Sequence, residues 1–277
     1  MAAPKIPTLS AHGAEIPAIG FGTSSLGDCG EIVATALKLG YRHIDTAWKY
    51  GTERGVGAGI RASGVPRGEI FLTTKVSHEY LRRDDFARSV DESLANLGVD
   101  FVDLLLVHWP NPEIPLAEPI AALAQAKRAG LARHIGVANF NIALLDQAIR
   151  LCPEPLVTLQ AEYHAHLDQT KLTQACRERG MIFTAYCPLG RGRLLRDGVL
   201  ADIAAHKGRP LAQVALRWLI QQGNIVAIPR SSNAKRMAEN LAVFDFTLSA
   251  DEMARIAALK RPDGRIANPV GRVPPWD

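Results

Sequence analysis

The sequence has few cysteines, and none of them is placed as a pair. Cys29, Cys152, Cys176 and Cys187 are scattered along the chain, with no Cys-x-x-Cys spacing among them. Disulfide frameworks and thiolate zinc sites both depend on closely or regularly spaced cysteines, so we expect neither here. Free thiols fit a reducing compartment. The sequence therefore predicts a cytoplasmic protein without a metal centre.

Long apolar runs and strong charge of one sign are also missing. No apolar run approaches the roughly 20 residues that a helix needs to span a bilayer, and residues 1–7 lack the apolar core of a signal peptide. The formal net charge is +4, and the mild excess of basic residues comes without clustered arginines and interleaved aromatic residues. We expect a soluble, monomeric or weakly associating protein that binds a small molecule and neither nucleic acid nor a membrane.

What the 277 residues contain instead is an alternation of strand-like and helical segments. Residues 6–18 predict a two-stranded hairpin, and eight short apolar runs that follow predict strands. Such an alternation is typical of a parallel barrel or an open doubly wound sheet, and eight units favour a single (β/α)8 domain, a TIM barrel, over residues 1–277. The expected strands are 19–23, 43–47, 70–76, 102–109, 135–139, 157–163, 182–186 and 225–229.

Amphipathic segments between these runs predict helices, and two stretches stand outside the repeat. Residues 194–207 form a long insertion after the seventh strand, and residues 248–260 predict an added helix that begins at Ser249-x-x-Glu252, a capping pattern. The tail from residue 261 is rich in proline, glycine and arginine, which predicts irregular structure. The expected helices include 84–97, 119–129, 142–151, 172–179, 211–221 and 234–243.

Four reactive side chains follow three successive strands. Asp45 lies at the end of the strand 43–47 and Tyr50 comes shortly after it, while Lys75 and His108 end the next two strands. Catalytic groups collect at the C-terminal edge of a parallel barrel, so we expect these four side chains to meet there.

These four groups suit proton transfer to a carbonyl oxygen. A tyrosine titrates near pH 10 in water, so Tyr50 needs a neighbour that favours its anion. Lys75 would lower the pKa of Tyr50, and Asp45 would keep Lys75 charged and oriented. His108 could hydrogen-bond the same substrate oxygen or the phenol. Since no member is an obvious nucleophile and no metal is required, the set predicts protonation of a carbonyl oxygen while a hydride reaches its carbon.

The motifs around these residues occur in the order and spacing of a known family. They are residues 40–47 with Tyr50, Thr73-Thr-Lys75, residues 105–109, Gly136-Val-Ala-Asn139 and residues 228–231. Along nearly its whole length the sequence resembles the aldo-keto reductases. The resemblance implies an NADPH-dependent carbonyl reductase whose hairpin closes the bottom of the barrel. It implies a catalytic tetrad of Asp45, Tyr50, Lys75 and His108, and a substrate pocket formed by Trp48, Lys49, His108 and Trp109.

The segment 228–240 predicts a phosphate site from its residues alone. It leaves a strand through Pro229 and enters a helix near Asn233, so backbone amides and basic side chains meet at a helix N-terminus. The resemblance implies that Arg230 and Ser231 hold the 2′-phosphate of NADPH, which favours NADPH over NADH. The further cofactor contacts that it implies are Gly22, Thr23, Asp45, Asn139, Gln160, Tyr186, Leu189, Arg236, Glu239 and Asn240.

The sequence departs from the common family pattern at Ala138, Leu159 and Cys187, where serine, asparagine and serine are frequent. One cofactor hydrogen bond is then missing, at a cost on the order of 1 kcal/mol. Total length and a short tail resemble the bacterial 2,5-diketo-D-gluconate reductases and reductases of small dicarbonyls such as methylglyoxal. Lys49, together with Arg191, Arg193 and Arg196 after the seventh strand, suggests an acidic sugar as substrate.

Four other interpretations remain open. Gly20-Phe-Gly22 begins like a dinucleotide fingerprint, but Ser25 occupies the third glycine position. His164-Ala-His166 and His43-x-Asp45 have the spacing of metal ligands on a strand, as in a metallohydrolase barrel. Lys75 on a barrel strand also permits a Schiff-base aldolase, although Asp45 would keep that lysine charged. A barrel that binds NADPH without turnover, as a sensor or structural protein, is the fourth.

Overall fold

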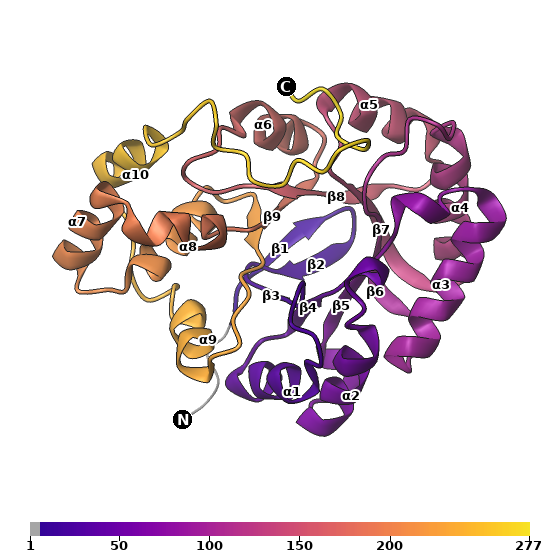
Figure 1. Cartoon of the computed structure of the whole chain (residues 1–277), viewed down its shortest axis with the longest axis horizontal. Helices are drawn as coiled ribbons and strands as arrows, with labels where there is room; N and C mark the ends of the chain where they lie inside the picture. The colour runs from indigo at the N-terminus through magenta and orange to yellow at the C-terminus, as the bar shows by residue number, and fades with distance from the viewer. Residues whose placement is uncertain (1–5) are drawn as a thin grey trace.

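The computed structural model describes residues 6–277, and the first five residues of the segment analysed for a signal peptide lie outside this range. Its centre is an eight-stranded sheet in which every paired neighbour runs parallel and the strands follow chain order (Figure 1). The strands are β3 (Phe21–Gly22), β4 (His43–Asp45), β5 (Phe71–Val76), β6 (Val102–Val107), β7 (Ala132–Ala138), β8 (Leu156–Glu162), β9 (Ile182–Tyr186) and β10 (Ile225–Ala227).

Backbone hydrogen bonds join the two ends of this sheet. Ile19, just before β3, forms a parallel bridge with Ala227 of β10. The amide of Gly20 donates to the carbonyl of Ala227 over 2.8 Å, and the amide of Gly22 donates to that of Pro229 over 3.0 Å. The sheet is thereby closed into a barrel, which confirms the predicted (β/α)8 fold.

Helices surround the barrel, and two of them are additional to the repeat (Figure 1). The helix α7 (Gly198–Lys207) falls within the predicted insertion, and α10 (Ala250–Ala257) begins at the predicted capping box of Ser249 and Glu252. No helix within residues 6–277 is both long and apolar enough to cross a bilayer. The other helices are α1 (Gly30–Leu39), α2 (Glu53–Ser63), α3 (Arg83–Leu97), α4 (Ala117–Arg128), α5 (Ile142–Leu151), α6 (Thr170–Glu178), α8 (Leu211–Ile220) and α9 (Ala234–Leu241).

The hairpin closes one end of the barrel. Its strands β1 (Thr8–Ala11) and β2 (Ala14–Pro17) are antiparallel, as predicted, and Figure 1 shows them across the middle of the ring of strands. Ala14 and Ile16 are fully buried and belong to one apolar cluster with inward-facing residues such as Leu104 and Ile182. Burial of this apolar surface fixes the hairpin on the barrel.

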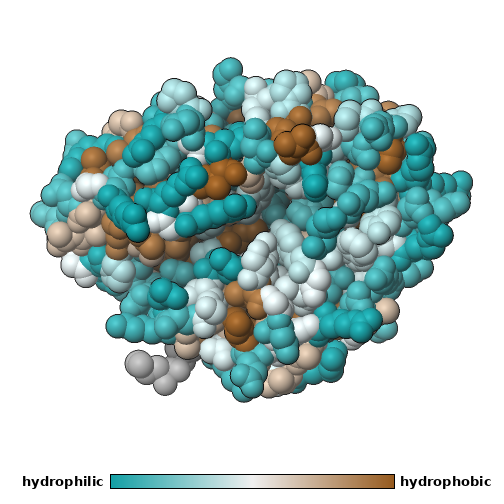
Figure 2. Space-filling view, in the orientation of Figure 1, coloured by the Kyte–Doolittle hydropathy of each residue, from teal (hydrophilic) through white to brown (hydrophobic). Residues whose placement is uncertain are grey.

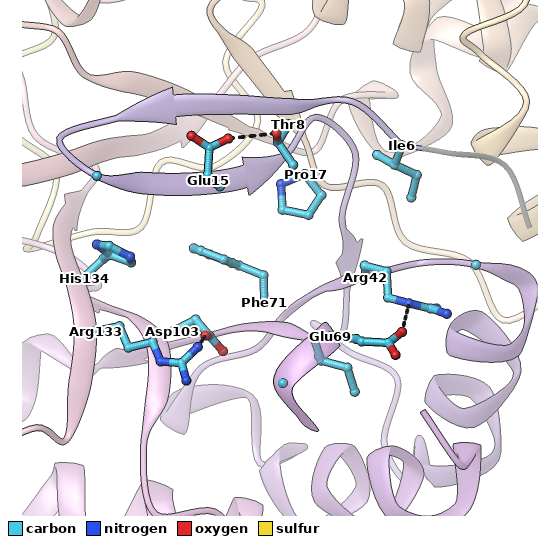
Figure 3. A pocket seen from close by; sticks show the side chains of 14 residues that line it. Ile6, Thr8, Glu15, Pro17, Arg42, Glu69, Phe71, Asp103, Arg133 and His134 are labelled. Carbon is cyan, nitrogen blue, oxygen red and sulfur yellow. Dashed lines mark hydrogen bonds and ion pairs between the residues drawn. The ribbon is translucent and has the colours of Figure 1, made fainter. Parts of the chain in front are cut away.

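A cavity of about 540 Å³ lies between the hairpin and the beginnings of the strands (Figure 3). Four of its charged side chains form two ion pairs: Arg42 lies 3.5 Å from Glu69, and Arg133 lies 3.1 Å from Asp103. None of the predicted catalytic residues lines it. Ion pairs therefore line this end of the barrel, and the predicted catalytic residues lie at the opposite end.

The tail, residues 261–277, contains no helix or strand, as predicted. It runs along the top of the view in Figure 1, past β8 to a C-terminus near α5. The fully buried carboxylate of Glu162, the last residue of β8, accepts hydrogen bonds from the amides of Ile266 at 2.7 Å and Ala267 at 2.6 Å. The tail is thus attached to the C-terminal ends of the strands.

Candidate active site

A buried ion pair lies at the C-terminal ends of β4 and β5. Lys75 Nζ lies 2.6 Å from Asp45 Oδ1 and also donates to the carbonyl of Thr46 over 2.7 Å. The Lys75 side chain is 0% exposed and that of Asp45 is 2% exposed. Burial would lower the pKa of Lys75, but its interactions, first with Asp45 and then with Tyr50, outweigh burial and raise it. Lys75 is therefore a positively charged ammonium group inside the protein.

Tyr50 lies directly beside this ammonium group. It ends the short helix η1 (Trp48–Tyr50), which follows β4, and Lys75 Nζ is 5.0 Å from the centre of its ring. Burial raises the pKa of Tyr50 and the charge of Lys75 lowers it, with a net rise above the ordinary value. Lys75 thus lowers the pKa of Tyr50, as predicted, but burial is the larger effect. The phenol is protonated at neutral pH and is a proton donor.

His108 completes the group from the end of β6. Its ring meets that of Tyr50 edge to face, with centroids 5.5 Å apart and planes at 83°. Burial first, and then the charge of Lys75, hold the pKa of His108 well below its usual range. The imidazole is therefore neutral and can donate one hydrogen bond to an oxygen without carrying a charge. All four predicted catalytic side chains are brought together.

Three polar side chains at the ends of β7, β8 and β9 extend this group. Gln160 donates to the second oxygen of Asp45 over 2.8 Å. Asn139 adopts a left-handed backbone conformation (φ 63°), donates to the carbonyl of His108 over 2.9 Å and accepts from the hydroxyl of Tyr186 over 2.7 Å. These contacts connect Gln160 to Asp45, and they connect Tyr186 through Asn139 to the backbone of His108.

The three departures from the family pattern have different surroundings. Ala138 and Leu159 are fully buried, and Leu159 packs among the residues of the main apolar core. Cys187, directly after β9, adopts a left-handed conformation with φ 50°. Its thiol has a raised pKa because it is buried. Cys187 is therefore an uncharged thiol next to Tyr186.

The predicted phosphate site lies where β10 leads into α9. Asn233 caps this helix by accepting from the amide of Arg236 over 3.0 Å. Arg230 donates to the carbonyl of Ser25 over 3.1 Å, and the exposed guanidinium of Arg236 has no ion pair or hydrogen bond with any residue in the described range 6–277. Two cations at a helix N-terminus suit a phosphate group, so these residues fit the phosphate end of a dinucleotide.

The remaining predicted cofactor residues come from the ends of β3, β9 and β10 and from α9. The amide and the hydroxyl of Thr23 both donate to the carbonyl of Asp45, over 3.0 and 3.1 Å. A side chain on Gly22 would come within 3.1 Å of the carbonyl of Ile228, which explains the glycine. The other four are Ser231 and Asn240, both buried, and Leu189 and Glu239, both half-buried.

Aromatic rings border the catalytic group, and two of them were not predicted. The predicted Trp48 packs edge to face on Tyr80, with centroids 4.7 Å apart, and the predicted Trp109 lies 6.4 Å from Trp276 of the tail. Lys49 donates to both carboxylate oxygens of Glu79 over 2.9 and 2.8 Å. The charge of Lys49 is therefore paired with that of Glu79 at the protein surface.

The two histidines of His164-Ala-His166 have separate carboxylate partners. His164 lies 2.9 Å from Glu162, and His166 lies 2.9 Å from Asp197. Within residues 6–277 no group of three or more potential ligands could hold a metal ion, which gives the metallohydrolase interpretation no support. Both histidines instead line a cavity of about 660 Å³ together with Arg191, Arg193, Arg196 and Arg261.

The sequence and the backbone are both similar to those of known proteins. The model of the aldo/keto reductase family matches residues 18–261. The chain belongs to this family. It is 42% identical over 267 residues to the methylglyoxal reductase DkgB of Escherichia coli O157:H7, covering 95% of this chain and 99% of that protein. The predicted family and the predicted class of enzyme, an oxidoreductase, are confirmed.

Two solved structures have closely similar backbones. A protein proposed to be a 2,5-diketo-D-gluconic acid reductase B matches with a TM-score of 0.97 and 47% identity, over 99% of this chain and 98% of that one. A variant of Gox0644 in complex with NADPH matches with a TM-score of 0.90 and 36% identity, over 96% and 97%. Membership of this family also replaces the dinucleotide-fingerprint and aldolase interpretations of the sequence.

Proposed function

We propose that this aldo-keto reductase uses NADPH to reduce an aldehyde or ketone to an alcohol, with Asp45, Tyr50, Lys75 and His108 as its catalytic residues. The observation that carries the proposal is the buried Lys75 ammonium group between Asp45 and the ring of Tyr50. A buried charge is costly unless a partner compensates for it. Buried charged groups that perturb the pKa of a neighbour are frequent at functional sites. Here its nearest titratable neighbour besides Asp45 is a protonated phenol.

In this mechanism Tyr50 donates a proton to the carbonyl oxygen of the substrate. The phenolate that forms is stabilised by the adjacent Lys75, whose own charge is held by Asp45. Neutral His108 donates a hydrogen bond that orients the carbonyl oxygen and favours its developing negative charge. The cofactor, when bound, supplies the hydride that the carbonyl carbon accepts.

Besides Asp45, the cofactor residues named above form three sets. Asn139, Gln160 and Tyr186 lie beside the catalytic group and suit the nicotinamide end. Arg230, Ser231 and Arg236 lie at the start of α9 and suit the 2′-phosphate, while Gly22, Thr23, Leu189, Glu239 and Asn240 line the path between them or the adenine end. The solved relative that contains NADPH supports this choice of cofactor.

For the substrate we propose a small dicarbonyl or a sugar-acid ketone, such as methylglyoxal or 2,5-diketo-D-gluconate. The names of the relatives at 42% and 47% identity support both. Trp48 and Trp109 supply an apolar wall, and Lys49 at the rim is proposed to contact the substrate through its stem. We further propose a cytoplasmic monomer in which residues 1–277 form one domain.

A panel assay that follows NADPH absorbance tests this function. Methylglyoxal, 2,5-diketo-D-gluconate, aromatic aldehydes and steroid ketones are compared at equal enzyme concentration. We expect turnover of one or both of the first two, with higher kcat/KM than for the steroids. A protein that binds NADPH but turns over none of these compounds would support the alternative of a sensor or structural barrel.

A further inference from the structure

The tail is a strap fixed at both of its ends. On one side, Glu162 holds the amides of Ile266 and Ala267. On the other, Asn141 donates to the carbonyl of Pro275 over 2.8 Å, and the carboxylate of Asp277 accepts from an α5 amide over 2.9 Å. The segment between these anchors crosses the C-terminal ends of the strands, where Figure 2 shows a hollow in the surface. It also lies beyond the part of the chain that matches the family model, residues 18–261.

Arg272 comes from the middle of this strap and reaches the segment that follows β5. Its Nη1 lies 3.3 Å from Nδ1 of His78, a residue of the short helix η3 (His78–Tyr80) that follows β5. The charge of Arg272 is one of the causes, after burial, that lower the pKa of both His78 and His108. The same helix η3 carries Tyr80, on which Trp48 of the helix that ends at Tyr50 packs. The guanidinium therefore lies at the rim of the proposed substrate pocket.

The guanidinium of Arg272 lacks a carboxylate partner. Within residues 6–277 it forms no ion pair, and its buried Nε has no hydrogen-bond partner. Two other cations near these strand ends are paired: Lys49 with Glu79, and Arg261, which lies 3.6 Å from Asp197. Burying a donor of a charged group without a partner is unfavourable, so this position is explained best by an anion that is bound during function.

We infer that Arg272 binds the carboxylate of an acidic carbonyl substrate and is the residue that selects it over a neutral one. The inference rests on the proposed function and names the residue that gives that function its charge preference. A guanidinium presents paired N–H donors that match a carboxylate, and a partly enclosed pocket protects such a pair from screening. Lys49 and Arg191, Arg193 and Arg196 are not needed for this preference.

Arg265 has a supporting role in the same strap. Its guanidinium carbon lies 3.6 Å from the centre of the Trp276 ring, and Trp276 in turn packs against Trp109 next to His108. This stacking adds Trp276 to the apolar wall formed by Trp109. A substrate with a carboxylate at one end and a flat or aliphatic body would match the two sides, which is why we choose a matched pair of aromatic aldehydes as probes.

The test compares 4-carboxybenzaldehyde with its methyl ester in wild type and Arg272→Met. Wild type should have the higher kcat/KM for the acid. In Arg272→Met the KM for the acid should rise roughly tenfold or more, as expected for loss of a charge-assisted hydrogen bond, while the ester changes less than about twofold. Lys260, directly before the tail, forms an exposed ion pair with Asp168. Lys260→Met removes the same charge as Arg272→Met and should leave the KM for both substrates unchanged. Arg272→Lys should keep part of the preference.

Three outcomes would overturn the inference. The acid and the ester could lose activity together in Arg272→Met, which would mean that Arg272 only fixes the strap through His78. The variant could keep the wild-type preference, or wild type could show no preference at low salt. In all three outcomes wild type still reduces the ester, so the proposed carbonyl reduction stands. Reduction of neither aldehyde by wild type would instead contradict the proposed function itself.

Discussion

Lys75 Nζ lies 2.6 Å from Asp45 Oδ1 in a part of the barrel where neither side chain is more than 2% exposed. Removing one partner of such a pair leaves an uncompensated buried charge. Asp45→Asn should therefore lower the free energy of unfolding by about 3 to 5 kcal/mol and greatly reduce turnover. Urea unfolding and the NADPH assay measure the two effects separately.

A double variant separates charge from packing in this pair. Asp45→Asn combined with Lys75→Met removes both charges, so it should regain much of the stability lost in Asp45→Asn while remaining inactive. If the double variant were less stable than Asp45→Asn, the cost of burying Lys75 alone would not be the cause of the instability.

The cations at the beginning of α9 predict the choice of cofactor. Arg236→Ala should weaken NADPH binding roughly tenfold and leave NADH binding nearly unchanged, because only NADPH carries the 2′-phosphate. Quenching of tryptophan fluorescence gives both dissociation constants. Lys235→Ala, which removes the neighbouring and 86% exposed cation of the same helix, is the matched control and should change neither constant. Equal losses for both cofactors would remove Arg236 from the phosphate site.

His43 predicts how stability changes with pH. Burial lowers the pKa of His43 from 6.5 to about 4, while the unfolded chain still takes up a proton near pH 6.5. The unfolded state then binds more protons, so the free energy of unfolding should fall between pH 6.5 and pH 4 and not above that window. At about 1.4 kcal/mol for each unit of pKa, the loss from this residue is about 3 kcal/mol.

The non-titrating variant His43→Gln isolates this contribution. It should be less stable than wild type at pH 7, because the contact of His43 with Thr73 at 3.1 Å is altered. Its free energy of unfolding should nevertheless decrease less steeply between pH 7 and pH 4. Parallel pH profiles for the two proteins, from urea unfolding at several pH values, would show that His43 does not titrate in this way.

Gly264 predicts how sensitive the strap is to its point of attachment. A Cβ atom at this position would lie 1.9 Å from the carbonyl oxygen of His166, which is backbone and cannot move aside easily. Gly264→Ala should therefore cost about 1 to 3 kcal/mol of stability and raise the KM for an acidic aldehyde by displacing Arg272. Gly198→Ala, with no atom within 4 Å of its Cβ, is the control. Unchanged thermal unfolding in Gly264→Ala would contradict the close contact.

Much of the fold, and the meeting of the four side chains at one edge of the barrel, could be predicted from the sequence, because local patterns determine them. Apolar runs followed by Asp45, Lys75 and His108 mark successive strand ends, and parallel strands bring their C-terminal ends to one edge. The direction of the Tyr50 pKa could not be predicted in the same way. It depends on the balance between burial and the charge of Lys75, and burial is a property of the whole packed barrel.

Contacts between distant segments could not be predicted from the sequence, for a related reason. Arg272 meets His78 across 194 positions of the chain, and neither residue belongs to a periodic pattern. The contact of the buried Glu162 carboxylate with the tail was likewise not predicted from the sequence, where the neighbouring His164-Ala-His166 is the more conspicuous pattern. Proline, glycine and arginine in the tail indicate irregular structure, but they do not indicate which strand ends that structure covers.

The most direct test of the mechanism is the turnover of Tyr50→Phe measured together with its affinity for NADPH. The account predicts that kcat falls by about 100-fold or more, because the proton donor is lost, while the dissociation constant for NADPH changes less than about threefold, since Tyr50 lies on the substrate side. Turnover in Tyr50→Phe equal to that of wild type would contradict the assignment of Tyr50 as the proton donor.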